Sequence, residues 1–138
     1  MMSFAILTGV GSAHAADLRC VPDSGQQTFF ANGRAQSAPA KVGADDGFTI
    51  TIKAGGEPDI IWNTPHWDFK SLSEGGLRAT LLQDSNLDGN FGLVAGGPNV
   101  SYILQVNGDD EAGVRRYLLT TTLFVGAYTV ATEHGVCR

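Results

Sequence analysis

The sequence predicts an all-β fold: a single small antiparallel β-sandwich or barrel of about eight strands, with its termini tied by one disulfide. Apolar and polar residues alternate along most of the chain, and no segment follows the 3.6-residue period of a helix. Turn-forming clusters recur about every 8 to 12 residues. Strands this short pair antiparallel with their neighbours, and 138 residues is a suitable length for one domain.

The first fifteen residues resemble a secretory signal peptide. An uncharged apolar run from Phe4 to Val10 precedes small residues ending in Ala13-His14-Ala15, which matches an A-x-A cleavage site. We therefore expect a signal peptide over residues 1–15 that is cleaved after Ala15, a single all-β domain over 16–138, and a periplasmic or secreted location. The basic residues that usually begin such a signal are missing, so a cytoplasmic protein with a short N-terminal strand or tail is the alternative.

Two cysteines, Cys20 and Cys137, lie near the two ends of the expected domain. In an oxidising compartment their simplest pairing is one disulfide that joins the termini. A reactive or metal-binding thiol pair is the rival interpretation. It is disfavoured because the sequence has neither CxxC spacing nor clustered histidines.

The N-terminal part of the domain carries two short strand candidates, Leu18–Val21 and Thr28–Phe30. The cluster Pro22-Asp23-Ser24-Gly25 between them is typical of a turn. The following stretch, 31–43, is rich in alanine, includes Pro39 and lacks a clear alternation. We expect it to form a long surface loop or a poorly ordered edge.

The middle of the chain begins with a half-buried strand over Phe48–Lys53. Phe48, Ile50 and Ile52 fall on one face of this strand, and polar residues fall on the other. Three further runs, each bounded by turn-forming residues, have the composition of strands: Asp59–Asn63, Leu77–Gln83 and Phe91–Ala95.

The C-terminal part predicts a long hairpin. One arm covers Val100–Val106, the other begins near Val114, and the acidic turn Asn107–Asp110 follows the first arm. Alternation places one set of side chains on the shared buried face: Val100, Tyr102, Leu104, Val106, Tyr117, Leu119, Thr121, Leu123 and Val125. A last strand is expected over Tyr128–Glu133.

The segment Asp84-Ser85-Asn86-Leu87-Asp88-Gly89 matches the opening of an EF-hand calcium loop. Oxygen atoms of Asp84, Asn86 and Asp88 would be the ligands, and Gly89 would allow the sharp turn. The twelfth position is Ala95 instead of the usual bidentate glutamate, and the flanking residues resemble strands. A polar β-turn is therefore the competing interpretation, and Ca²⁺ is the only cofactor that the sequence suggests.

The eight residues from Trp62 to Phe69 contain both tryptophans, a histidine and a carboxylate. Aromatic rings beside polar groups are typical of a ligand-binding loop, so Trp62, His66, Trp67 and Asp68 are the candidate binding residues. Large aromatic residues are also highly buried on average. The alternative is that Trp62 belongs to the core while Trp67 and Phe69 plug one end of a barrel.

The charge pattern argues against several partners. The chain has a net charge of −5, and its nine lysines and arginines form no basic stripe that could neutralise phosphates. We therefore expect no nucleic acid and no anionic membrane surface as a partner. No apolar run approaches the roughly 18 residues of a membrane-spanning helix.

Catalytic patterns are weak in this sequence. No G-x-S-x-G turn is present, and the paired carboxylates lie in turns, where solvated charges are common. We expect a non-enzymatic exported module, of the envelope-inhibitor or adhesion type, that binds a protein or small ligand through its loops. The alternatives are a calcium-assisted hydrolase-like enzyme that uses His66 and Asp68, and a structural subunit that assembles through strand edges.

Overall fold

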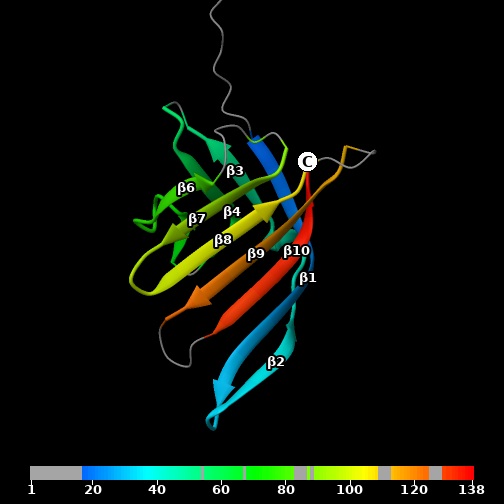
Figure 1. The fold of residues 1–138 in the computed structure, drawn as a ribbon, viewed down its shortest axis with the longest axis vertical. Helices are drawn as coiled ribbons and strands as arrows, with labels where there is room; N and C mark the ends of the chain where they lie inside the picture. The colour runs from blue at the N-terminus through cyan, green and yellow to red at the C-terminus, as the bar shows by residue number, and fades with distance from the viewer. Residues whose placement is uncertain are drawn as a thin grey trace, which may run out of the picture.

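The computed structural model describes residues 17–53, 55–66, 68–82, 87, 89–108, 113–124 and 129–138. Ten strands in these segments form one antiparallel sheet in the order β5-β4-β3-β1-β10-β9-β8-β7-β6, and β2 pairs with β1 beside this path (Figure 1). The elements are β1 (Asp17–Ala31), β2 (Arg34–Ala40), the 3₁₀ turn η1 (Ala44–Asp46), β3 (Phe48–Ile52), β4 (Pro58–His66), β5 (Phe69–Ser71), β6 (Arg78–Leu82), β7 (Phe91–Gly96), β8 (Val100–Val106), β9 (Arg115–Leu123) and β10 (Val130–Cys137).

The sheet curls into a half-barrel, which confirms the predicted all-β antiparallel class (Figure 1). β4 and β6 come from opposite ends of the strand order and contact each other. The buried hydrophobic residues of the strands form one core cluster. The hairpin of β1 and β2 projects beyond the other strands (Figure 1). The expected signal peptide, residues 1–15, lies outside the described residues.

The predicted turn at Pro22–Gly25 is wrong, because β1 continues through it. The pairing of β1 with β10 shifts register between Pro22 and Ser24, which is the signature of a β-bulge. A bulge tolerates proline, which cannot donate to the ladder. Gly135 lies opposite Pro22, and a side chain there would come within 2.7 Å of the Pro22 Cα atom. Glycine therefore allows the two strands to stay paired at the bulge.

The long surface loop expected over residues 31–43 is also wrong, because β2 occupies residues 34–40, although this stretch does lie at an edge, as its alternative stated. Ala31 pairs with Arg34, so Asn32 and Gly33 form a two-residue hairpin turn between β1 and β2. Both have positive φ angles, 53° and 73°, as the favoured tight hairpin turns require. β2 is an edge strand that is mostly exposed, so its sequence lacks the alternation that burial imposes.

The predicted hairpin of the C-terminal part is confirmed as β8 and β9, which pair from Val100–Leu123 to Val106–Tyr117. The expected face of β8 is buried along its whole length. The last strand starts at Val130, near the expected position, and extends to Cys137. Two short strands that the sequence did not suggest, β2 and β5, bring the number in the described segments to ten instead of about eight.

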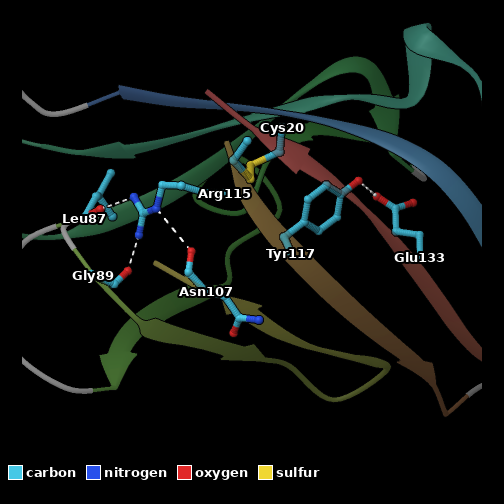
Figure 2. Close-up of a disulfide and its surroundings, with 8 residues drawn as sticks. Cys20, Leu87, Gly89, Asn107, Arg115, Tyr117 and Glu133 are labelled. Atoms are coloured by element: carbon cyan, nitrogen blue, oxygen red, sulfur yellow. Dashed lines mark hydrogen bonds between the residues drawn. A yellow bond between two sulfur atoms is a disulfide. The ribbon is translucent and has the colours of Figure 1, made fainter. Parts of the chain in front are cut away.

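The predicted disulfide joins Cys20 of β1 to Cys137 of β10, and both residues are fully buried (Figure 2). The two cysteines lie directly opposite each other in the β1–β10 pairing. Because these strands are adjacent in the middle of the sheet, the bond joins the N-terminal strands to the C-terminal ones.

The buried Arg115 of β9 lies near the disulfide and connects two loops by hydrogen bonds (Figure 2). Its guanidinium group donates hydrogen bonds to the carbonyl oxygens of Leu87 and Gly89, and its Nε donates to the carbonyl of Asn107 at 3.3 Å. The same group lies 5.2 Å from the centre of the Phe91 ring. These contacts hold the loop before β7 against the loop after β8 at this end of the half-barrel.

Candidate functional site

A cavity of about 450 Å³ lies toward the end of the half-barrel that is farther from the disulfide. Small-molecule sites typically measure roughly 300 to 1,000 Å³. The wall combines the later parts of β1, β4 and β9 with the first part of β10, and it includes the segment between β2 and η1. The cavity is therefore assembled from strands that are far apart in the sequence.

Trp62 forms the inner end of the cavity. Its indole is 5% exposed and lies at the level of the disulfide, because Phe48 pairs with both Trp62 and Cys20. Its ring centre is 5.0 Å from that of His66, 5.8 Å from that of Phe69 and 5.4 Å from that of Tyr102. These rings pack β4 and β5 against β8 across the interior.

His66 follows Trp62 on the same strand and lines the cavity. A hydrogen bond of 2.9 Å joins its Nδ1 to the hydroxyl of Tyr102, which is fully buried. Burial lowers the pKa of His66, and the carboxylate of Asp46 partly opposes this effect. The imidazole therefore favours its neutral form in the folded protein.

Glu133 of β10 is a partly buried carboxylate in the cavity wall. Its Oε1 accepts a hydrogen bond of 3.0 Å from the Tyr117 hydroxyl (Figure 2). Burial raises the pKa of Glu133, the hydrogen bond from Tyr117 opposes that shift, and the nearby charge of Asp46 adds to it. Burial and the Glu133 charge also raise the pKa of Tyr117, so the phenol remains the donor.

The η1 segment carries a second carboxylate of the cavity wall. The Asp46 Oδ2 atom accepts a hydrogen bond of 2.6 Å from the Gly43 N–H, which orients this exposed side chain. The hydroxyl of Thr64 donates to the Asp45 carbonyl at 2.9 Å and so ties η1 to β4. Lys41 also lines the cavity and is exposed.

The structure brings together two of the four residues that the sequence suggested for ligand binding. Trp62 and His66 both line the cavity, and the buried position of Trp62 agrees with the alternative that it belongs to the core. Asp68 is exposed and is not among the lining residues, whereas Trp67 lies outside the described residues.

The three predicted calcium ligands, Asp84, Asn86 and Asp88, lie outside the described segments, so the calcium site stays a prediction. The described residues of that loop include Leu87 and Gly89, whose carbonyl oxygens accept hydrogen bonds from Arg115. In the part of the chain that the structure describes, no three His, Cys, Asp or Glu side chains cluster to hold a metal ion.

Sequence reasoning missed Glu133, although the sequence contains a signal for it. Residues two apart on a strand share a face, so Glu133 lies on the same face of β10 as Cys137, which the disulfide places in the core. A carboxylate on this face is an inward-facing polar group. It was overlooked because the predicted strand ended at Glu133, four residues before the cysteine.

Comparison with known proteins gave no match: no family model, no curated protein and no solved structure matches the chain. Across the described segments, none of the helical structure has the length and apolar character needed to span a membrane.

Proposed function

We propose that the protein is a binding module that takes up a small organic ligand inside the half-barrel. The observation that carries this proposal is the cavity of about 450 Å³. Its wall combines apolar side chains, such as Leu119 and Leu123, with the inward-facing polar residues His66, Thr121 and Glu133. The wall also includes Gln27, Thr64, Thr129 and Thr132, so it offers a ligand both apolar surface and several hydrogen-bonding groups.

This proposal moves ligand binding from the loops to the concave face of the sheet. Trp62 and His66 support it, because they contact each other at the cavity instead of projecting from a surface loop. His66 is also the residue on which the hydrolase alternative depended. Its bond to the buried Tyr102 and its lowered pKa favour a fixed, neutral group that orients a ligand.

The proposal is tested by filling the cavity. Ala131 of β10 lines it, and Ala131→Trp would place a large ring in the space. The matched control is Ala35→Trp, because Ala35 is exposed on β2 and is not among the lining residues. Both variants are made in the full chain with the disulfide oxidised.

A library of cavity-sized organic compounds is screened by calorimetric melting. A true ligand raises the melting temperature by roughly 10 °C when its concentration is about one hundred times Kd. We expect Ala131→Trp to weaken binding by about tenfold or more, because the indole occupies space that the ligand needs, and tenfold corresponds to about 1.4 kcal/mol. Ala35→Trp should bind as the wild type does. Equal binding by all three proteins, or no stabilising compound in the library, would contradict the proposal.

A further inference from the structure

We infer that the cavity selects an organic cation, in which an ammonium or similar group is attached to an apolar body. This inference rests on the proposed function, because it specifies the ligand of the same cavity. It depends on the two carboxylates of the wall, Asp46 and Glu133. Each of them can accept further hydrogen bonds beyond those from its protein neighbours.

Glu133 provides the inner carboxylate. In the described part of the chain, the Tyr117 hydroxyl is its hydrogen-bond donor, and no lysine or arginine forms an ion pair with it. A carboxylate has about four acceptor positions, so one donor leaves capacity for a ligand. A partly buried carboxylate is stabilised when a cation binds next to it, because burial penalises its charge.

Negative charge exceeds positive charge in the wall of the cavity. Asp46 raises the pKa of Glu133, which means that the two negative charges repel each other across the site. His66 also lines the cavity, but its lowered pKa favours the neutral imidazole. Among the described residues of the wall, Lys41 is the one lysine or arginine, and it is exposed to solvent. A ligand cation would relieve the repulsion between Asp46 and Glu133.

The aliphatic part of the wall suits the apolar body of such a ligand. Val42, Leu119 and Leu123 contribute aliphatic side chains, and Thr121 contributes a hydroxyl that can accept a hydrogen bond. The Trp62 indole is largely covered by neighbouring rings, so we assign it to packing and not to contact with the charge. The charge of the ligand is therefore recognised by carboxylates and its body by aliphatic groups.

The inference is tested with matched probes that differ only in their polar group. One series is benzylamine, benzyl alcohol and benzoate, and the other is cyclohexylmethylamine, cyclohexylmethanol and cyclohexanecarboxylate. Calorimetric titration of the full oxidised chain at neutral pH gives each affinity. We expect each ammonium to bind about tenfold more tightly than its alcohol, because hydrogen bonds to charged groups contribute about 1.5 to 3 kcal/mol. The carboxylates should bind most weakly.

The key variant is Glu133→Gln, which keeps the size of the side chain and an oxygen that can accept from Tyr117. It should remove most of the preference for ammonium over alcohol, because the neutral amide no longer favours a charged ligand group. The control is Glu57→Gln, an exposed residue that faces Arg78 at 3.5 Å and is not among the lining residues. If Glu133→Gln fails to fold, Asp46→Asn at the exposed carboxylate should reduce the same preference about threefold, given the weaker coupling of exposed charges.

The outcomes separate this inference from the proposed function. If alcohols and carboxylates bind as tightly as ammonium compounds, and Ala131→Trp weakens them all, the cavity binds ligands but the inference is wrong. If library compounds bind in the cavity while no probe of either series does, the inference is likewise overturned and the proposed function stands. An ammonium preference that Glu133→Gln leaves intact would also overturn it.

Discussion

His66 shows how one partly buried residue can make the stability of this fold depend on pH. The pKa of the folded imidazole is lowered by burial, whereas the unfolded chain has the ordinary histidine value of about 6.5. As pH falls through that value, the unfolded state takes up a proton that the folded state resists. The folded state therefore loses stability on acidification, in the window from about 6.5 down to the lowered pKa.

This effect can be isolated with His66→Asn. Both proteins are unfolded with urea across the range from about pH 5 to pH 8. The free energy of unfolding of the wild type should fall more steeply below about pH 6.5 than that of the variant. The two curves should run parallel above this window, where the histidine is neutral in both states. Parallel curves through the whole range would show that His66 titrates normally in the folded protein.

The raised pKa of Glu133 makes the stability of the fold change with pH in the opposite direction. Its folded pKa is raised, so the folded state holds its proton to a higher pH than the unfolded chain does. Its contribution is present below the unfolded pKa of about 4.3 and is lost as pH rises through the folded value. Above that folded value, burial penalises the ionised Glu133, and a cation bound beside it would offset the penalty, as expected for a carboxylate in a functional site.

The strands illustrate which parts of the fold are readable from the sequence. β8 and β9 were predicted because one face of each is buried, and burial imposes a period of two on the residue types. β2 has no buried residue and shows no such period. Its signal was the Asn32-Gly33 pair, whose positive φ angles form the hairpin turn. Turn chemistry, not alternation, identifies an exposed strand of this kind.

The β1–β2 hairpin should depend on Gly33. Its φ angle of 73° lies in the left-handed region, where a β-branched residue is strained by roughly 1 to 2 kcal/mol. We expect Gly33→Val to increase the hydrogen-exchange rates of the β2 amides by about 5- to 30-fold. The amides of β10 near Cys137 should be unaffected, because the hairpin projects beyond the other strands (Figure 1).

Ala35→Val is the control for this prediction, because Ala35 is an exposed strand residue that pairs with Phe30. Valine favours strands, so this variant should leave the exchange rates of β2 unchanged or lower. Uniformly faster exchange across β10 in Gly33→Val would show that the hairpin is not an independent unit. The residues after β2 line the cavity, so a loosened hairpin should also weaken ligand binding.

At the scale of the whole molecule, the cavity could not be predicted from the sequence. It depends on the order of strands, which places β10 beside β1 and curls β4 toward β6. Trp62 and Glu133 are 71 positions apart in the chain and line the same cavity only because of this order. Periodicity indicates which side of a strand is buried, but it carries no information on which strands are neighbours.

The disulfide is the one long-range contact that the sequence did predict, and it should contribute a large part of the stability. It joins residues 117 positions apart on the adjacent strands β1 and β10. The chain-entropy relation gives about 5 kcal/mol for a loop of this length. Small domains are typically stable by about 5 to 15 kcal/mol, so losing this bond removes much of the total.

We therefore expect the double variant Cys20→Ala, Cys137→Ala to unfold at a much lower urea concentration than the oxidised wild type. Alanine is used because both positions are fully buried, where a hydroxyl would add a desolvation penalty. The wild type measured with and without reductant is the control, since reduction breaks the bond without changing the core residues. A loss below about 1 kcal/mol in both comparisons would mean that noncovalent contacts alone hold the two halves of the sheet together. A ligand that occupies the cavity should raise the unfolding midpoint of the double variant, because it binds only where β1, β4, β9 and β10 are assembled.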